Sequence, residues 1–483
     1  MDSNLLDLHG ESGDVAADRS FRGHWWTSRL TGPLVAAAAV RFALLAVALT
    51  RKGVGSLITL DTVSYLEPGR NLLLHGRFVI DGVPDLFRTP GYPLFLAITS
   101  LPGLPAAAVA NVILSVFSVI LVWRLARAAF RDDRIALGAA WIFAFEPLTI
   151  LLSVSLMSEP LFLVFVLLSL ERVAEFLQQH RLPVLAAGGV WLAAATFVRP
   201  VTYYLPVLLA AGLFLVLLRK PGLRWKAPAV LLISALPWLA AWQARNWIET
   251  GYRGFCSITE TNLYFWNAGS VLAHIEHKEL GLVRFELGDP GSIKLNGQGY
   301  LTTAYLSAHP EQAGWSQGQR LAFMHSEAIR IIRAHPGIQF RGCLFAFFRV
   351  IFDTDARSFD TLVYPGEPKH IADGLREQGL VRGALTFAGA YPWIAVEKAV
   401  FAIAMLGLYL LAMRGVFCGR LEKSCLWLLL GTSAYFLILA GAIGGTWTDG
   451  RYRLPAMPAV CILAAASLRR TKTIADNKAR VST

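Results

Sequence analysis

Long runs of apolar residues recur along the chain from about residue 33 to about residue 468. A transmembrane helix needs about 20 predominantly apolar residues to cross about 30 Å of hydrocarbon, and many of these runs approach that length. The pattern predicts about ten transmembrane helices, at residues 33–50, 104–123, 135–152, 160–177, 184–197, 203–218, 228–243, 395–413, 425–442 and 454–468. We therefore expect an all-α polytopic membrane protein.

Two shorter apolar stretches, near 91–103 and 342–352, leave the number of spans open. Each is consistent with a helix at the membrane interface, with a re-entrant segment or with a crossing. If both crossed, the two termini would keep their side of the membrane, but the loops between the two stretches would change sides. The loop charges argue against that arrangement.

Basic residues cluster in the loops of one side. Lys and Arg are concentrated in cytoplasmic loops of membrane proteins, so these clusters place both termini in the cytoplasm. The clusters are Arg124, Arg127, Arg131 and Arg134; Arg219, Lys220, Arg224 and Lys226; Arg414, Arg420 and Lys423; and Arg469, Arg470, Lys472, Lys478 and Arg480. The net charge of +12 thus reflects topology, and since no nucleic-acid-binding motif accompanies it, we expect no nucleic-acid partner.

Composition agrees with one unit built around lipid. The chain is 55% hydrophobic and only 16% charged, with a mean hydropathy of +0.49, far from the average soluble domain. About thirty largely polar residues precede the first apolar run, which lacks a small-residue cleavage site, so we expect that run to be retained. The expected parts are a cytoplasmic tail (1–30), a catalytic bundle (31–243) with a first external loop (51–103), an external acceptor-side layer (244–392), C-terminal transmembrane helices (393–468) and a basic cytoplasmic tail (469–483).

The five cysteines are too few for a disulfide scaffold. Cys256 and Cys343 share the predicted external side, so a disulfide between them is one option and two buried thiols are the other.

Carboxylates and guanidinium groups gather on the predicted outer side. Asp61 begins the first external loop in "LDTVSYLEPGRN", and Glu159 interrupts the apolar stretch "SVSLMSEPLFLVFVLLSL". A carboxylate at a helix centre in the bilayer costs about 2.5 to 3.5 kcal/mol, so it usually faces water, a partner or a substrate. The arginines predicted on the same side are Arg88, Arg199, Arg451 and Arg453.

This inventory suits a lipid phosphate. Guanidinium groups bind phosphate bidentately, and an arginine at the membrane interface can hold a phosphate while the lipid tail stays in hydrocarbon. A neighbouring carboxylate would act as a general base on an incoming hydroxyl or as a ligand for a divalent cation. A glycosidase needs both an acid and a base, but a polyprenyl phosphate leaves as a stable anion, so one base and cationic stabilisation suffice.

Several motifs, taken in order, resemble the GT-C superfamily of polytopic glycosyltransferases. The resemblance is to bacterial relatives of the protein O-mannosyltransferases and of the lipid A aminoarabinose transferase, and it runs over nearly the whole chain. It rests on Asp61 with Tyr65 after the first span, and on "RTPGYPLFLA", "MSEPLF", "FVRP", "ARNWIETGYRGFCSITETNLYFWNAG" and "GRYRLPAMPA". It implies a GT-C-like bundle of about ten or more transmembrane helices with external amphipathic helices and loops.

The resemblance also implies a reaction. An inverting glycosyltransferase of the bacterial cytoplasmic membrane would move a sugar from a polyprenyl-phosphate donor to an acceptor at a site facing the periplasm or exterior. The acceptor would be an envelope glycan such as lipopolysaccharide, a lipid or a protein. Asp61 matches the catalytic acidic residue of the first external loop, which serves as base or metal ligand, and Glu159 matches a second carboxylate at the next outer turn. A divalent cation held by Asp61 and Glu159 stays open.

The remaining candidate residues would bind the donor phosphate or sugar: Arg88, Arg199, Arg451, Arg453, Tyr65 and Tyr92. Arg88 stands where relatives place a basic residue before the Pro-Gly-Tyr stretch. The mannosyltransferase branch often carries Asp-Glu in the first loop, but Thr62 follows Asp61 here. This departure weakens the case for protein mannosylation.

Each candidate also has a simpler structural interpretation. Asp61 would suit the N-cap of an interfacial helix, and Glu159 before Pro160 would suit a solvated first helical turn. The arginines would suit interfacial or loop charges, and the tyrosines a membrane-belt position. Glu146, nearby in sequence, would either join the site or pair with Arg41.

Three other classes of protein share parts of this pattern. A lipid-linked oligosaccharide ligase or polymerase would use the same carrier, typically with a large external loop rich in Arg and His. A polyprenyl-lipid transporter would concentrate its charges near the bilayer midplane, and a polyprenyl-lipid binding protein would bind the lipid without turnover.

Overall fold

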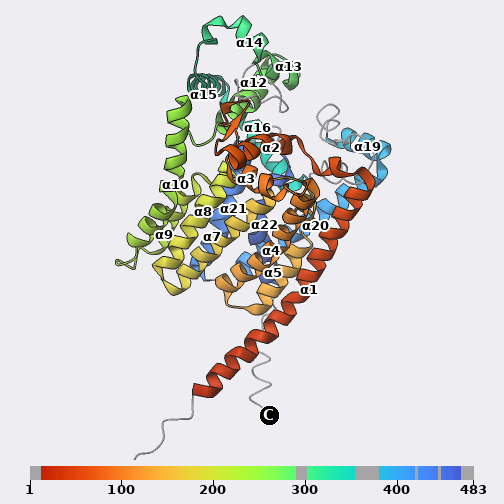
Figure 1. The fold of residues 1–483 in the computed structure, drawn as a ribbon. Coiled ribbons are helices and arrows are strands. Elements are labelled where there is room, and N and C mark those ends of the chain that lie inside the picture. Colours follow the sequence, from red (N-terminus) through yellow and green to blue (C-terminus); the bar gives the residue numbers. More distant parts are fainter. Residues whose placement is uncertain (1–11, 290–301, 354–379, 419–421, 444–447, 469–483) are drawn as a thin grey trace, which may run out of the picture.

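The computed structural model describes residues 12–289, 302–353, 380–418, 422–443 and 448–468, so the predicted basic tail 469–483 lies outside the described residues. The described chain is almost entirely helical (Figure 1). Its one sheet is a two-stranded antiparallel hairpin of β1 (Val79–Ile80) and β2 (Val83–Pro84). The predicted all-α polytopic fold is confirmed.

All ten predicted spans are helical. They correspond to α1 (Ser12–Lys52), α4 (Leu104–Phe130), α5 (Asp133–Ala144) with α6 (Pro147–Val154), α7 (Glu159–Gln179), α8 (Leu182–Val198), α9 (Leu205–Val216), α10 (Lys226–Thr250), α20 (Pro392–Cys418), α21 (Lys423–Ile443) and η6 (Gly450–Ala456) with α22 (Met457–Ser467). Within the described ranges, five helices are long and apolar enough to cross a membrane, namely α1, α4, α10, α20 and α21.

The expectation of one continuous helix over 135–152 is wrong. The segment bends by 54° between α5 and α6, and the pair forms a sixth candidate span only if counted together. Pro147 cannot donate a backbone hydrogen bond, which favours a new helix start there. The Glu146 side chain caps this start by accepting the Thr149 N–H at 2.7 Å.

The two ambiguous apolar stretches lie in helices that are shorter than the roughly 20 residues that a membrane crossing needs. Residues 91–103 contain α3 (Gly91–Thr99), and at 1.5 Å per residue nine residues cover only about 14 Å. Residues 342–352 belong to α16 (Pro336–Phe352), which packs against α21.

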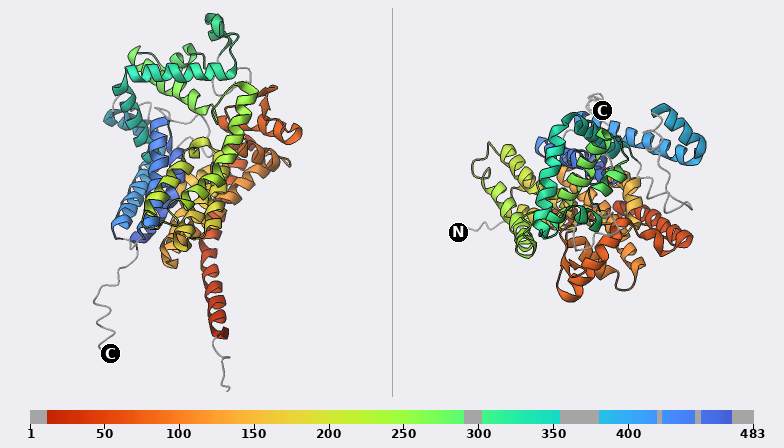
Figure 2. Two further views of the ribbon diagram at one scale, coloured as in Figure 1. Left: turned by 90° about the vertical axis from the view of Figure 1, so that its left-hand side faces the viewer. Right: turned by 90° about the horizontal axis from the view of Figure 1, so that it is seen from above.

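The start of α1 and the end of α22 lie at one end of the bundle (Figures 1 and 2), which we call the lower end because it is drawn at the bottom of Figure 1. Further helices cover the upper end: α11 (Ile258–Thr261), the π-helix η3 (Asn262–Ala268), α12 (Gly269–Ile275), α13 (Leu280–Glu286), α14 (Thr303–Ala308), η4 (Pro310–Gln312) and α15 (Gln317–Ala334). The remaining described elements are η1 (Val54–Leu57), η2 (Pro200–Thr202) and α19 (Leu380–Ala390).

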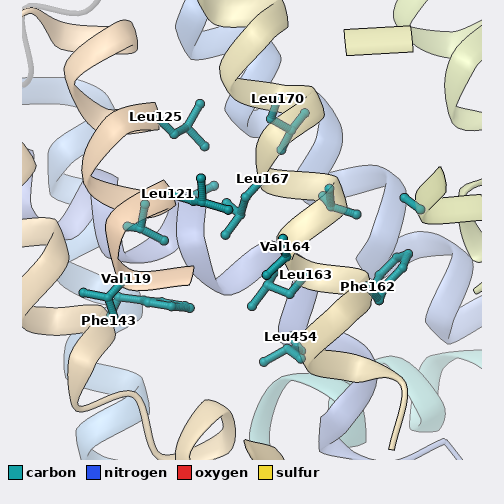
Figure 3. Packing of buried hydrophobic residues seen from close by; sticks show 14 of the residues in the cluster. Val119, Leu121, Leu125, Phe143, Phe162, Leu163, Val164, Leu167, Leu170 and Leu454 are labelled. Atoms are coloured by element: carbon teal, nitrogen blue, oxygen red, sulfur yellow. The ribbon is translucent and has the colours of Figure 1, made fainter. Parts of the chain in front are cut away.

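The core lies where α4, α5, α7 and α22 pack together. Leu121 and Leu125 of α4 face Leu167 and Leu170 of α7 (Figure 3), and all four are at most 4% exposed. Burying one such side chain contributes about 1.5 to 3 kcal/mol. This core holds the start of α7, and therefore Glu159, in place.

Two glycines allow α3 to pack closely against α2 and the end of α8. A Cβ on Gly69 of α2 (Leu60–His75) would lie 2.2 Å from the Pro93 carbonyl oxygen, and one on Gly91 would lie 2.6 Å from that of Phe197. Such distances are far below van der Waals contact, so only glycine permits these approaches. The close packing brings α2, α3 and the end of α8 together around one region.

Candidate active site at the upper end of the bundle

Asp61 lies in the first turn of α2 but does not cap it. The Thr59 side chain accepts the Thr62 N–H at 3.3 Å, and the Thr62 side chain accepts the Thr59 N–H at 2.9 Å, which forms a capping box. The interpretation of Asp61 as the N-cap is therefore wrong. Thr62 also donates to the Leu156 carbonyl at 2.9 Å, which ties α2 to the turn before α7.

Two arginines from distant parts of the chain hold the Asp61 carboxylate. Arg88 Nη2 donates to Oδ1 at 2.6 Å, and Arg451 Nη1 donates to Oδ2 at 2.8 Å. Burial would raise the pKa of Asp61, but the charges and hydrogen bonds of the two arginines outweigh burial and hold that pKa well below its usual range. The side chain is 29% exposed, so Asp61 sits charged at a surface that a ligand can reach.

Hydrogen bonds and aromatic contacts hold the Arg88 side chain in place. Its Nε donates to Ser64 at 2.8 Å and its Nη1 to the Tyr65 hydroxyl at 3.2 Å. The guanidinium carbon lies 4.4 Å from the ring centre of Tyr65 and 4.8 Å from that of Phe87. Cation–π contacts of this kind stabilise a guanidinium in one orientation. We call the group Asp61, Ser64, Tyr65, Arg88 and Arg451 the Asp61 cluster.

Tyr92 packs against the Tyr65 ring of this cluster. It is fully buried, and its hydroxyl accepts a hydrogen bond from Asn111 at 3.1 Å. Its ring meets that of Tyr65 edge to face, with centroids 4.9 Å apart. Tyr65 therefore contacts the charged groups directly, whereas Tyr92 packs behind it.

Glu159 and Arg199 form a second, more deeply buried pair. Glu159 is the first residue of α7 and only 2% exposed, so the interpretation as a solvated helix start is wrong. Its carboxylate is paired with Arg199, whose Nη1 also donates to Ser158 at 3.2 Å. The Ser158 hydroxyl lies 3.5 Å from that of Tyr65, which links this pair to the Asp61 cluster.

The two arginines of η6 have different surroundings. Arg451 reaches Asp61, but Arg453 is fully buried and donates to the carbonyls of Val350, at 3.0 Å, and Asp353 at the end of α16. Arg453 therefore anchors η6 on α16, and it contributes no contact to the Asp61 cluster.

A small, partly open pocket lies between α7, α21 and η6, with a cavity volume of about 20 Å³. One part of its wall is charged or polar and the other is apolar. Its lining residues are Glu159, Arg199, Arg451 and Tyr452, then Phe162, Val201, Phe436, Ala440, Leu454 and Pro455. The lining thus presents charged groups beside an apolar surface, the two kinds of contact that a charged head group with an adjoining hydrocarbon segment makes. Arg451 belongs both to this pocket and to the Asp61 cluster.

Two aspartates that the sequence analysis missed organise the cluster. Asp85 Oδ1 accepts the N–H groups of Phe87, at 2.8 Å, and Arg88, at 3.4 Å. Burial raises the pKa of Asp85 to about 6. Asp449 accepts the Arg451 N–H at 3.1 Å and pairs with Arg451 Nε at 3.1 Å. An aspartate just before a short turn, as in "PDLFR" and "TDGRYR", is the local signal for such a role.

The cation alternative does not fit the described residues. Both Asp61 oxygens are occupied by arginines and Glu159 is paired with Arg199. No group of three or more acidic, His or Cys side chains suited to a metal occurs among the residues that the structure describes.

Glu146 lies in a separate buried network. Arg41 donates to Ser115 at 2.8 Å and to the Thr149 side chain at 3.0 Å, and Glu146 caps the helix that contains Thr149. The two side chains thus meet through Thr149, and Glu146 is absent from the Asp61 cluster.

Cys256 and Cys343 are free thiols, so the disulfide option is wrong. The Cys256 thiol donates to the Phe87 carbonyl at 2.9 Å, next to Arg88.

Comparison with known proteins agrees with this picture. Residues 92–242, about a third of the chain, match the family model described as dolichyl-phosphate-mannose-protein mannosyltransferase. No curated protein matches the chain.

Two solved structures match over most of this chain, each with a TM-score below 0.5. The oligosaccharyltransferase of Archaeoglobus fulgidus in its apo form is 15% identical, with a TM-score of 0.47, over 96% of this chain and 52% of that one. ArnT from Cupriavidus metallidurans bound to undecaprenyl phosphate is 16% identical, with a TM-score of 0.30, over 91% of this chain and 78% of that one. The chain thus spans about half the length of the archaeal enzyme.

Proposed function

From its membership of the GT-C superfamily of polytopic membrane glycosyltransferases, we propose that this protein is an inverting glycosyltransferase that uses a polyprenyl-phosphate sugar donor. The observation that carries the proposal is the position of Arg451. This residue contacts the Asp61 carboxylate and also lines the pocket that is charged on one part of its wall and apolar on the other. In this proposal the base, Asp61, and the lipid-phosphate site adjoin each other.

The donor would bind with its phosphate against Arg199 and Arg451. The first isoprene units would lie against the apolar lining, including Phe436 and Leu454, and the rest of the tail would leave between helices into the bilayer. Guanidinium groups bind phosphate through paired hydrogen bonds, and they do so strongly where water is excluded. The sugar would extend toward Asp61 and Tyr65.

Asp61 would act on the acceptor. Its carboxylate accepts the proton of the acceptor hydroxyl while that oxygen bonds to the anomeric carbon of the sugar. The bond from this carbon to the phosphate oxygen breaks on the opposite face, which inverts the configuration. The polyprenyl phosphate leaves as an anion, and the arginines stabilise the negative charge that grows on it. Glu159 would keep Arg199 oriented for that task.

The external helices would select the acceptor, which we propose to be an envelope glycan, a lipid or a protein hydroxyl. The upper end of the bundle would then face the periplasm or exterior of a bacterial cell. In this proposal the parts of the chain keep their predicted roles, with 31–243 and 393–468 as the membrane bundle and 244–392 as the acceptor-side layer. Exchange of this layer with that of a related enzyme should change acceptor preference.

The test is turnover in liposomes. The wild type and Asp61→Asn are each given a panel of polyprenyl-phosphate sugars with crude envelope acceptors, and release of free polyprenyl phosphate is followed. A general base contributes about 10² to 10⁴-fold to the rate, so we expect a loss of that size in the variant. Asp133→Asn is the matched control because it removes a carboxylate paired with Arg127 at the lower end.

Equal release by the wild type and a folded Asp61→Asn would exclude Asp61 as the base. That result would favour a ligase or polymerase with its chemistry elsewhere. Specific binding of polyprenyl phosphate without release from any donor would favour a binding protein or transporter.

A further inference from the structure

We propose that Asp449 is a positioning residue that keeps Arg451 ready to move from Asp61 to the donor phosphate. This inference rests on the proposed function. In this inference, Arg451 controls access to the base. Without donor, Arg451 covers one oxygen of Asp61, and when donor binds, Arg451 leaves that oxygen free.

The two arginines of the Asp61 cluster are held very differently. Arg88 has three side-chain hydrogen-bond partners, Asp61, Ser64 and Tyr65, and lies over two aromatic rings. It is absent from the pocket lining. Arg451 instead pairs with two carboxylates and lines the pocket. Of the two, Arg451 is therefore the residue that an incoming anion meets first and can displace.

Asp449 determines what Arg451 can reach after it leaves Asp61. Its Oδ1 accepts the Arg451 backbone N–H, which fixes the start of η6, and its Oδ2 pairs with the side-chain Nε. The Nη1 end of the same guanidinium is the part that contacts Asp61. A rotation of the guanidinium group would transfer that end from Asp61 toward the pocket while Nε stays paired with Asp449.

Charge competition supplies the reason for the exchange. In the described structure Arg451 lies between the carboxylates of Asp61 and Asp449. The donor phosphodiester has two free acceptor oxygens and one negative charge, as a carboxylate has, and it would lie in the pocket that Arg451 already lines, so it competes with Asp61 for Nη1. Asp61 would then keep Arg88 alone, and its second oxygen would be free for the acceptor hydroxyl. Donor binding would thus precede activation of the acceptor.

The proposed exchange predicts whether Asp449→Asn strengthens or weakens the binding of polyprenyl phosphate. Replacement of an aspartate beside an anion site usually strengthens anion binding, because repulsion is removed. If Asp449 presents Arg451 to the phosphate, Asp449→Asn should instead weaken binding of polyprenyl phosphate. We expect a loss of about ten-fold, the size of one misplaced charge-assisted hydrogen bond. Asn can still accept the backbone N–H of Arg451, so the start of η6 should persist.

The experiment measures the affinity of the full-length protein in nanodiscs for undecaprenyl phosphate, with the neutral alcohol undecaprenol as reference. The variants are Asp449→Asn, Arg451→Gln and the double variant. A residue that acts through Arg451 has no further effect once Arg451 is replaced, whereas a merely structural residue causes the same loss in both backgrounds. Asp449→Glu should restore part of the affinity. Asp132→Asn, at the N-cap of α5, is the control for loss of a capping carboxylate.

Asp61→Asn provides a second measurement that does not depend on the folding of an Asp449 variant. With its competitor neutralised, Arg451 should bind phosphate about ten-fold more tightly, and this gain should vanish in the Arg451→Gln background.

Three results would overturn the inference. These are unchanged or tighter binding by Asp449→Asn, an equal loss with and without Arg451, and an Asp61→Asn gain that persists in Arg451→Gln. If the wild type binds undecaprenyl phosphate no better than undecaprenol, the proposed function itself fails. Binding specific for the phosphate without these couplings would leave the proposed function intact and reject only the role of Asp449.

Discussion

Ion pairs occur at both ends of the bundle, but the two sets differ in how they are built. At the lower end, Arg127 pairs with Asp133 and Arg172 with Glu175, partners that are six and three residues apart and lie partly exposed. At the upper end, Arg88, Arg199 and Arg451 pair with Asp61 or Glu159, which lie 27 to 390 residues away. Exposed local pairs contribute about 0 to 1 kcal/mol.

Under the proposed function, this difference separates charges that set topology from charges that take part in the reaction. These two lower pairs need only water and a neighbouring turn, whereas a third lower pair, Arg124 with Glu171, joins α4 to α7. Arg127 belongs to one of the basic clusters that are predicted to mark the cytoplasmic side. The upper pairs need several helices to arrive at one point, and they are mostly withdrawn from water. Such an arrangement is costly unless the charges are used.

The largest effect that this comparison predicts is on stability. Glu159→Gln leaves the Arg199 charge without its buried partner, so it should lower the free energy of unfolding by about 3 to 5 kcal/mol. Glu175→Gln, which breaks the exposed pair with Arg172, should cost at most about 1 kcal/mol. Thermal or denaturant unfolding in a defined detergent measures both. Similar losses in the two variants would show that the upper pair has no special energetic role.

A smaller effect is expected for Arg88→Lys. Lysine keeps the charge but cannot donate at once to Asp61, Ser64 and Tyr65 in the planar arrangement of a guanidinium. Turnover of the polyprenyl-phosphate donor should fall about 10²-fold, the loss typical of one misplaced stabilising donor. Arg127→Lys at the lower end is the matched control and should keep wild-type turnover. Normal turnover of Arg88→Lys would mean that Arg88 contributes charge alone.

The smallest expected effect is on the pH dependence of stability, and it compares two aspartates that both accept backbone hydrogen bonds. Asp85 and Asp132 each accept two backbone N–H groups of the residues that follow them. The pKa of Asp85 is raised to about 6 in the folded protein, above its unfolded value of about 4. The folded state therefore binds more protons between these values, and stability should fall as the pH rises from about 4 to about 6.

Asp85→Asn removes this titration and retains the acceptor oxygen. The variant should gain about 2 kcal/mol relative to the wild type at pH 7 and should lose the downward slope between pH 4 and 6. Unfolding followed across this pH range measures both, with Asp132→Asn as the control for loss of a charge at a helix start. An unchanged slope in Asp85→Asn would assign the pH dependence to another group.

The sequence was sufficient for the helices but only partly for the site. Apolar length located a helix at each predicted position, because helix formation by an apolar run is a local property of the chain. Among the described residues, only five of these helices are long and apolar enough to cross a membrane by themselves. The break at Glu146 and Pro147 was missed, since a run of apolar residues continues across it. Asp61, Glu159, Arg88 and Arg451 were identified by residue type and predicted side, and the structure brings them together. Arg453 and Tyr92 were predicted by the same reasoning, but their roles differ. Arg453 anchors η6 on α16, and Tyr92 packs against Tyr65.

By itself, the sequence determined the all-helical membrane architecture and the resemblance to GT-C enzymes, and it predicted the side of the membrane on which the charged residues gather. These follow from hydropathy, loop charge and motif order, which are properties of neighbouring residues. Tertiary structure decided which arginine meets which carboxylate, and it showed Asp85 and Asp449 to be the residues that orient Arg88 and Arg451. The physical reason is distance along the chain: Asp61 and Arg451 are 390 residues apart, and only the packing of the helices makes them neighbours.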